Sequence, residues 1–334
     1  MDMENVNYPL VSIGVPVFNG EKSLNQTLEV LLKQDYPNLE IIISDNGSTD
    51  RTPEICEEFL KKDPRAKYYR SSENLGSNWN FNRVFDLSSG EYFMWAKHDD
   101  LRELSFVRAC VEKLEQCPEA VLCQAQVGMF IGNRKERLCI GNLDSFEGVT
   151  GLVERYRETL KHFPAVAIYG VYRSWALKKT HMMQHSIASD LAFIQELSIY
   201  GSFIQVPEIL FNYVGREKWN TVHDDYNGFS SKGRKPWWYF PFVVLFCDHW
   251  RRVALAELPF SLKLRFWLVL IDHELRQIIL KVLIKVCRRI CPAAIKEKLG
   301  CAIYRRWMQG PNVQIDCEDL FLERVIKPRL GWWR

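Results

Sequence analysis

The chain has 334 residues, of which 47% are hydrophobic and 25% charged, with a formal net charge of +3, the composition of an ordinary globular protein. No apolar run approaches the ~20 residues that span a bilayer, so no simple transmembrane helix is expected. The acidic start lacks the features of a secretion signal and ten scattered cysteines show no zinc-binding spacing, so we expect reduced thiols in a cytoplasmic protein.

Strand and helix patterns alternate along the first hundred residues. Apolar strands are predicted at 11–15, where Pro16 closes the strand, and at 40–44. Leucines at helical spacing predict a helix over 24–32, and Thr52-Pro53-Glu54 has the N-cap, the N1 proline and the first-turn acid of a second helix. With a further strand at 66–69 and a helix at 79–87, this order predicts a mostly parallel sheet covered by helices on both faces.

The most informative segment is an apolar strand at 91–96 that ends at Lys97-His98-Asp99-Asp100. Two adjacent carboxylates at the end of a buried strand suggest a metal ion, and a helix-capping pair of acids is the alternative. The earlier strands end in the polar loops Phe18–Gly20 and Asp45–Asp50. Because ligands bind at the carboxyl ends of strands in open α/β sheets, we expect the three loops to form one site.

The middle of the chain, from 105 to 213, has a less regular pattern. Ser189-Asp190 precedes three apolar residues at helical spacing, and Gly201 is expected to close that helix. Two short strands, Phe203–Val206 and Ile209–Tyr213, are predicted to follow. We expect this part to form the acceptor side of the same sheet.

The last third of the chain is basic, with 16 Lys or Arg and 5 Asp or Glu over residues 231–310, against 24 and 32 over residues 1–230. A polar hinge is expected over Arg216–Lys235, and a long helix over Leu262–Ile290 with apolar residues clustered on one side. Together with aromatic residues such as Trp267, the charge suits an anionic membrane surface. The alternatives are a helical subdomain whose aromatics pack on the core and a nucleic-acid site, for which no reader motif is recognisable.

Several short motifs follow one another along the first ~215 residues. They are Val15-Pro16-Val17-Phe18-Asn19, Ser44-Asp45-Asn46-Gly47-Ser48-Thr49-Asp50, Glu73-Asn74-Leu75-Gly76 with Asn82, Gly90-Glu91-Tyr92, His98-Asp99-Asp100, Ser189-Asp190 and Val206-Pro207-Glu208-Ile209-Leu210. In order and spacing, this set resembles the inverting glycosyltransferases of family 2, which have the GT-A fold. The resemblance covers about two-thirds of the chain.

The resemblance implies a site for a nucleotide sugar. The loop after the first strand would line the base, and Asp45 would bond the base or ribose, with a simple turn residue as the alternative. We expect Asp50 to be a turn or cap acid, with direct contact to the ligand as the alternative. The residues expected to bind the nucleotide sugar are Pro16, Phe18, Asn19, Asp45, Gly47, Ser48, Asn74, Gly76, Asn82, Lys97, His98, Asp100 and Arg216.

The resemblance also implies that Asp99 holds Mg²⁺ or Mn²⁺, with Asp100 in the same metal site or orienting sugar hydroxyls. Such an ion stabilises the nucleoside diphosphate as it leaves. The chain departs from the family pattern at Lys97, where members commonly have an acid, and at Phe81, where many have Arg. Lys97 therefore points away from the metal, contacts phosphate or ribose itself, or marks weak metal dependence.

Asp190 matches the family's catalytic base. Its role would be to take a proton from the acceptor hydroxyl while that oxygen attacks the anomeric carbon from the face opposite the diphosphate, which inverts the configuration. The alternative role is an N-cap for the helix that follows, and the two roles are compatible.

We therefore predict an α/β protein with a GT-A-type sheet in three parts: a nucleotide-sugar-binding half (1–104), an acceptor-binding and catalytic half (105–225) and a helical, basic region (226–334) that is a candidate for membrane association. The predicted activity is inverting transfer of a sugar to a hydroxyl of a glycan or lipid-linked glycan, in surface polysaccharide or glycan synthesis. The alternatives are a nucleotidyltransferase, for which no Gly-rich phosphate loop is seen, and a non-catalytic nucleotide-sugar-binding scaffold. The expected location is cytoplasmic, peripheral on the inner face of the membrane, with no nucleic-acid partner.

Overall fold

The computed structural model describes residues 8–97, 101–131, 139–141, 148–149, 151–161, 165–184, 186, 188–215, 239–290 and 314–315. Its strands are β1 (Val11–Val17), β2 (Leu39–Asp45), β3 (Ala66–Arg70), β4 (Tyr92–Trp95), β5 (Leu101–Arg102), β6 (Ala120–Ile131), β7 (Cys139–Gly141), β8 (Val171–Arg173), β9 (Ser202–Gly215) and β10 (Gln314–Ile315). Its helices are α1 (Leu24–Leu32), α2 (Thr52–Lys62), α3 (Ser77–Asp86), α4 (Phe106–Gln116), α5 (Leu152–Lys161), η1 (Ala165–Tyr169), α6 (Ser174–Lys178), α7 (Ser189–Leu197), α9 (Pro241–Leu255) and α10 (Phe260–Ile290).

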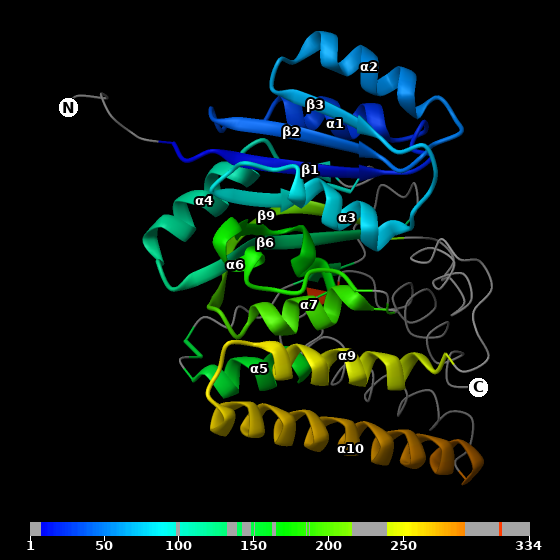
Figure 1. The fold of residues 1–334 in the computed structure, drawn as a ribbon, viewed down its shortest axis with the longest axis vertical. Helices are drawn as coiled ribbons and strands as arrows, with labels where there is room; N and C mark the ends of the chain where they lie inside the picture. The colour runs from blue at the N-terminus through cyan, green and yellow to red at the C-terminus, as the bar shows by residue number, and fades with distance from the viewer. Residues whose placement is uncertain are drawn as a thin grey trace.

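One sheet joins these strands in the order β10-β7-β6-β8-β4-β1-β2-β3, with β9 paired to β5 and β6. Strand β1 runs parallel to both β2 and β4, and β2 runs parallel to β3, so the carboxyl ends of these four strands lie at one edge. Strand β8 is antiparallel to its neighbours β4 and β6, whereas β9 is parallel to β6. Helices flank the sheet, and α9 and α10 lie beyond α7 at one end of the molecule (Figure 1). The predicted α/β, GT-A-like fold class is confirmed.

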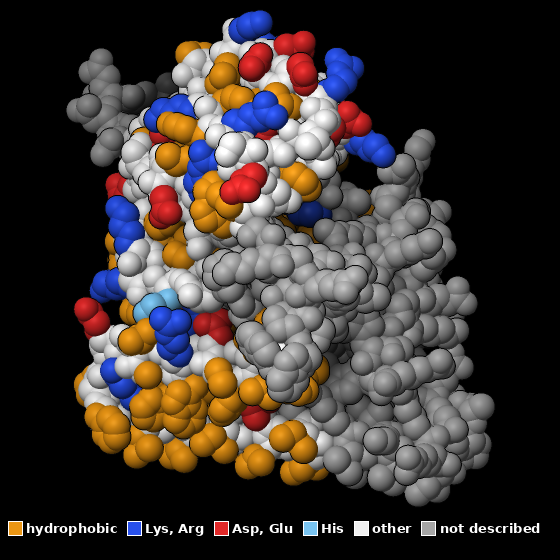
Figure 2. Space-filling model, turned by 45° about the vertical axis from the view of Figure 1, so that its right-hand side comes forward, with side chains coloured by type: hydrophobic (Ala, Val, Ile, Leu, Met, Phe, Trp, Pro, Cys, Tyr) orange, Lys and Arg blue, Asp and Glu red, His pale blue; other side chains and the backbone are white. Residues whose placement is uncertain are grey.

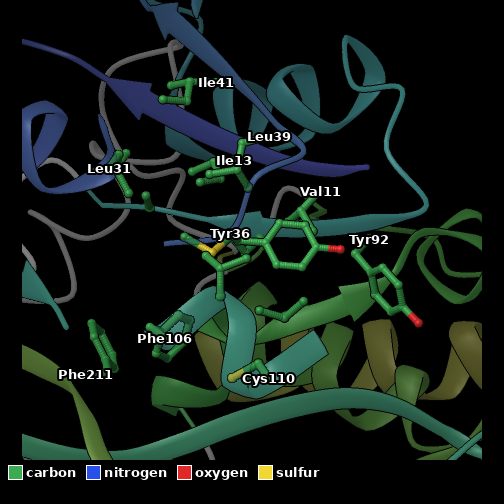
Figure 3. Packing of buried hydrophobic residues seen from close by; sticks show 14 of the residues in the cluster. Val11, Ile13, Leu31, Tyr36, Leu39, Ile41, Tyr92, Phe106, Cys110 and Phe211 are labelled. Atoms are coloured by element: carbon green, nitrogen blue, oxygen red, sulfur yellow. The ribbon is translucent and has the colours of Figure 1, made fainter. Parts of the chain in front are cut away.

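Strand β4 shows how one short apolar run supplies both faces of the sheet. Tyr92 and Met94 pack in a core cluster with α1, α2 and α4, whereas Phe93 and Trp95 pack in a second cluster with α3, α6 and α7. This division follows from the alternation of side chains along a strand. Figure 3 shows part of the first cluster, where residues of β1 and β2 meet Phe106 and Cys110 of α4. All four β4 residues are buried, as the sequence predicts for a central strand.

A third hydrophobic cluster lies outside the sheet and joins the C-terminal helices to the rest of the molecule. Tyr156 of α5, Val253 of α9 and Phe266 and Leu270 of α10 are buried together in it. The rings of Tyr156 and Phe266 meet edge-on at 4.8 Å between centroids. Helix α10 was predicted from its periodicity, whereas α9 and β8 were not predicted.

Two details near the first strands differ from the sequence-based predictions. Strand β1 continues through Pro16, which pairs in register with Ser44, instead of closing before it. Thr52 is the first residue of α2 and not its N-cap, because its hydroxyl donates to Asp50 and accepts from the Gly20 N–H. The carboxylate of Asp50 instead accepts from the Thr52 N–H at 3.0 Å, which makes Asp50 a turn acid.

Two further differences concern the segment after α7. The predicted strands Phe203–Val206 and Ile209–Tyr213 are one strand, β9, whose register against β6 shifts between Val206 and Ile209. Pro207 lies in that bulge, where its missing N–H is tolerated. Gly201 does not close α7, which ends at Leu197; it immediately precedes β9, at a point where a Cβ would lie 2.4 Å from the side chain of Val121.

Candidate active site

The loops that follow β1 and β2 are joined by hydrogen bonds at the carboxyl edge of the sheet. The Asn19 N–H donates to Ser48 Oγ at 2.9 Å, and the Asn19 side-chain oxygen accepts from the Thr49 N–H at 2.9 Å. Asn19 has a φ of 51°, a left-handed conformation that asparagine tolerates better than most residues. Pro16 is buried in β1, whereas Phe18 is 41% exposed at the mouth of this loop pair.

Asp45 ends β2 and is fully buried by its neighbours. Its Oδ1 accepts from the Ser48 N–H at 2.8 Å, and its Oδ2 accepts from the Tyr68 hydroxyl at 2.9 Å. Burial, and then the hydrogen bond to Asp45, raise the pKa of Tyr68, so this phenol stays protonated and donates. The half-exposed Arg70 guanidinium lies 3.4 Å from Asp45 Oδ2 and donates to the Ser48 carbonyl. The carboxylate is thus held in place by β3 and by its own loop.

A second set of hydrogen bonds attaches the segment before α3 to the same edge. Asn46 donates to Asn74 Oδ1 at 2.9 Å and accepts from the Leu75 N–H at 2.9 Å, while Asn74 Oδ1 also accepts from the Gly76 N–H. Gly47 has a φ of +75°, and a Cβ there would lie 2.6 Å from the backbone carbon of Glu73. Glycine is required at position 47 for both reasons.

Asparagine side chains of α3 make hydrogen bonds that connect the helix to neighbouring segments. Asn82 both donates to the Met183 carbonyl (2.9 Å) and accepts from the Met183 N–H (3.0 Å), so it fastens α3 to the segment before α7. Asn80, which sequence reasoning missed, is 3% exposed and bonds both the hydroxyl and the carbonyl of Ser44 next to Asp45. A polar residue one turn before the buried Val84 was the signal that could have identified it.

Lys97 follows β4 and turns towards β9. Its Nζ lies 5.4 Å from the centre of the Tyr213 ring, a cation–π distance. His98, Asp99, Asp100 and Arg216 lie outside the described residues. Among the residues that are described, no group of three or more His, Cys, Asp or Glu side chains is placed to hold a metal ion.

Asp190 lies in the first turn of α7, and its Oδ1 accepts from the Leu191 N–H at 3.0 Å. Ala188, with a φ of 59°, is the residue at the N-cap position, so the predicted alternative of Asp190 as the N-cap is wrong. Ser189 accepts from the Gln184 N–H at 2.6 Å and so ties the helix to the preceding segment. The N-terminus of a helix favours negative charge, so the ionised carboxylate suits this position.

A buried ionic network holds α7 against the C-terminal helices. The side chain of Glu196 is buried, at 1% exposed. Its carboxylate lies 2.6 Å from Arg252 Nη1 of α9 and 2.5 Å from His181 Nδ1. Arg252 also bonds Asp248 at 3.0 Å and the Met182 carbonyl at 2.8 Å. The segment before α7, which Asn82 binds at Met183, is therefore also bound by Arg252 of α9 at Met182.

The chain was compared with known protein families and with curated relatives. The family model for glycosyl transferase family 2 matches residues 12–183, just over half of the chain; Asp190 lies beyond that match. Glycosyltransferase GlyG of Streptococcus pneumoniae is 32% identical over 107 residues, 32% of this chain and 36% of that protein. The GalNAc(5)-diNAcBac-PP-undecaprenol beta-1,3-glucosyltransferase of Campylobacter jejuni is 36% identical over 93 residues, 28% of this chain and 30% of that protein. The chain thus spans about a third of the length of the curated relatives that it matches.

Solved structures share the fold at low sequence identity. S. aureus TarS 1–349 in complex with UDP has a TM-score of 0.58 at 17% identity, over 89% of this chain and 80% of that one. The mannosyltransferase PcManGT from Pyrobaculum calidifontis, in complex with GDP-Man and Mn²⁺, has a TM-score of 0.53 at 16% identity, over 90% and 81%. With the family match over residues 12–183, the chain belongs to glycosyl transferase family 2.

Proposed function

We propose that this protein transfers a sugar from a nucleotide-diphosphate sugar to a hydroxyl acceptor, with inversion at the anomeric carbon. Family membership supports the class of reaction. The observation that carries the proposal for this chain is that Asp45, buried at the end of β2, and Asp190, at the start of α7, belong to elements connected through α3. Two carboxylates held by connected elements suit the two tasks of the reaction: Asp45 would recognise the donor, and Asp190 would deprotonate the acceptor.

The nucleotide end of the site is proposed to lie at the loops after β1 and β2. The exposed ring of Phe18 suits stacking on a base. The hydrogen-bonded loops at this edge of the sheet include Asn19, Ser48, Asn74 and Gly76. A carboxylate has about four lone-pair positions, so Asp45 can still accept from a base or ribose while it keeps Ser48 and Tyr68. Arg70, whose side chain is half exposed, is the partner of Asp45 that a ligand would displace most easily.

Asp99 and Asp100 are proposed to hold a divalent cation, Mg²⁺ or Mn²⁺, and His98 and Arg216 to lie near the diphosphate. A hard cation at two carboxylates would supply positive charge for the departing nucleoside diphosphate. The position of Lys97 is compatible with this, because its ammonium lies over the ring of Tyr213. Mn²⁺ in the PcManGT structure supports a metal in a protein of this fold.

Asp190 is proposed as the base that accepts the proton of the acceptor hydroxyl. Its carboxylate is oriented by the Leu191 N–H, and its helix is held by the clamp around Glu196. The proposed acceptor is a glycan or a lipid-linked glycan, a class supported by the name of the Campylobacter jejuni relative. The three-part division at 104 and 225 and the cytoplasmic, peripheral location remain predictions.

The test separates donor binding from transfer. Asp190→Asn should abolish transfer while a thermal-shift panel of nucleotide sugars, with and without Mn²⁺, shows the same stabilising ligand as for the unchanged protein. Asp86→Asn, at the exposed end of α3, is the matched control and should retain both properties. Retained turnover in Asp190→Asn rejects the base, and a panel in which no nucleotide or nucleotide sugar raises the melting temperature rejects the donor site.

A further inference from the structure

Helix α10 presents apolar side chains on two opposite faces. The inner face, with Phe266, Val269 and Leu270, is buried against α5 and α9. The opposite face carries a row that we call the outer stripe, whose members are 37% to 71% exposed. It consists of Phe260, Leu264, Leu268, Ile271, Leu275, Ile278 and Ile279. Their spacing of three or four residues makes the row continuous along roughly 30 Å of helix.

The helix that carries the outer stripe is firmly attached to the molecule. Trp267 stacks on Trp250 of α9 with centroids 4.8 Å apart and planes at 10°, and its indole N–H donates to the Trp250 carbonyl. On the buried side, Phe266 packs on Tyr156 of α5. The inner face alone attaches α10 to α5 and α9, so the outer stripe does not contribute to the core in the described part of the chain. Figure 2 shows hydrophobic side chains gathered at the lower end of the molecule, where α10 lies.

A row of large apolar side chains in water needs a partner, because exposed patches of this kind mark interaction sites. None of the helices in the described part of the chain is long and apolar enough to cross a bilayer, so insertion of α10 across a membrane is not the explanation for its composition. The candidates are therefore a second protein surface and the surface of a lipid bilayer.

Charge distinguishes these candidates. The sequence of α10 contains seven basic residues, at 263, 265, 276, 281, 285, 288 and 289, against two acidic ones, at 272 and 274. Arg265 and Arg276 are exposed along one border of the outer stripe, where Arg276 also forms an exposed ion pair with Asp272 at 2.8 Å. Two copies that met through α10 would bring these positive helices together, whereas anionic headgroups would neutralise them.

We infer that the outer stripe docks on the surface of an anionic lipid bilayer, with α10 lying in the interface. The leucine and isoleucine side chains would enter the boundary between headgroups and acyl chains, while Arg265 and Arg276 would reach the headgroups from the side. Docking of this kind confines the protein to a membrane surface. The inference goes beyond the proposed transfer reaction and does not depend on it.

Co-sedimentation of the full chain with vesicles tests the inference without any nucleotide sugar. We expect binding at low salt to phosphatidylcholine vesicles that contain phosphatidylglycerol, and weaker binding to pure phosphatidylcholine. The double variant Leu268→Gln/Leu275→Gln should bind at least about tenfold more weakly, because two exposed leucines lose their transfer into lipid. The matched control is Leu104→Gln/Trp175→Gln, which changes two exposed apolar residues elsewhere and should bind like the unchanged protein.

Three results would overturn the inference. They are no binding to the anionic vesicles at low salt, equal binding by Leu268→Gln/Leu275→Gln, and a dimer in light scattering that the same variant dissociates. The substituted side chains are exposed, so the variant is expected to fold, and its circular dichroism and melting temperature verify this.

Discussion

The ring of Phe193 in α7 meets the indole of Trp95 in β4 edge-on, with centroids 5.6 Å apart and planes at 89°. Both side chains are fully buried, and Tyr172 of β8 packs against both of them. Asp190 lies one turn before Phe193, and Lys97 lies two residues after Trp95. This aromatic contact therefore fixes the start of α7, which carries the proposed base, relative to the end of β4.

Weakening that contact should lower turnover more than donor binding. Phe193→Leu keeps an apolar side chain but loses the edge-on contact, and we expect a stability loss of about 1–2 kcal/mol and a fall in kcat with little change in the KM for the donor. Phe85→Leu, in the same cluster but in α3, is the control and should cost similar stability without the loss of kcat. Equal effects of the two variants on kcat would mean that Phe193 acts only through overall stability.

Replacement of Gly47 should destabilise the protein through backbone crowding. Gly47→Ala combines a left-handed φ with a Cβ placed 2.6 Å from the backbone of Glu73, so we expect a loss of at least ~2 kcal/mol in urea unfolding. Gly148→Ala serves as the control, because Gly148 has a φ of +92° but nothing within 4 Å of the added Cβ. A smaller loss, of roughly 1 kcal/mol, is expected there. If the two variants lost equal unfolding free energy, the backbone near Glu73 would have to move away from the added Cβ without destabilising the protein.

The position of Lys97 predicts how an acid would act there. Lys97→Asp replaces an ammonium beside the proposed metal loop with a carboxylate, so the Mn²⁺ concentration for half-maximal transfer should fall by about tenfold. Lys33→Asp makes the same change of charge at the exposed end of α1 and should leave that concentration unchanged. An unchanged Mn²⁺ requirement in Lys97→Asp would contradict a metal bound next to position 97.

Acidification should loosen the contact between α9 and α10. Burial, followed by the charge of Arg252 and by His273, lowers the pKa of His249 to about 3, and burial lowers the pKa of His273 to about 4. In the unfolded chain both imidazoles titrate near 6.5, so the contribution of the two neutral histidines to the free energy of unfolding is complete above that pH. It is lost as the pH falls from about 6.5 towards 4 and 3, at up to ~1.4 kcal/mol per pH unit for each group.

The variant His249→Leu isolates one of these imidazoles. Urea unfolding between pH 7 and pH 4 should show a shallower fall in stability than in the unchanged protein, because the carboxylates are common to both and cancel in the comparison. The same pH dependence in both proteins would show that the pKa of His249 does not differ between the folded and unfolded states.

The regular elements of the first hundred residues were predictable because their signals are local. The apolar runs of β1, β2 and β4 and the leucine spacing of α1 each lie within one element. Strand β8 has only three residues, and its place between β4 and β6 depends on partners far along the chain, so no local pattern could predict it. The bulge at Pro207 is likewise set by the register of β9 against β6.

The candidate site could be predicted only to the level of its loops. Parallel strands bring Asn19, Asp45 and Ser48 to one edge, and the structure places them in one hydrogen-bonded set. The pairing of Asn82 with Met183 and the contact of Lys97 with Tyr213 depend on tertiary folding and were not evident from spacing. The roles of Asp45, Asp99 and Asp190 in ligand binding and catalysis remain predictions.

The ion pair between Glu196 and Arg252 determines what can be removed from this chain. The family match ends at residue 183, yet the carboxylate of Glu196 is buried beneath a guanidinium supplied by α9, well past the last strand that pairs with β6. A fragment ending at residue 215 would lack α9, so Glu196 would keep His181 but lose Arg252, and we expect the fragment to be less stable than the full chain. The stability of the segment that matches the family model is therefore expected to depend in part on a helix that lies outside it.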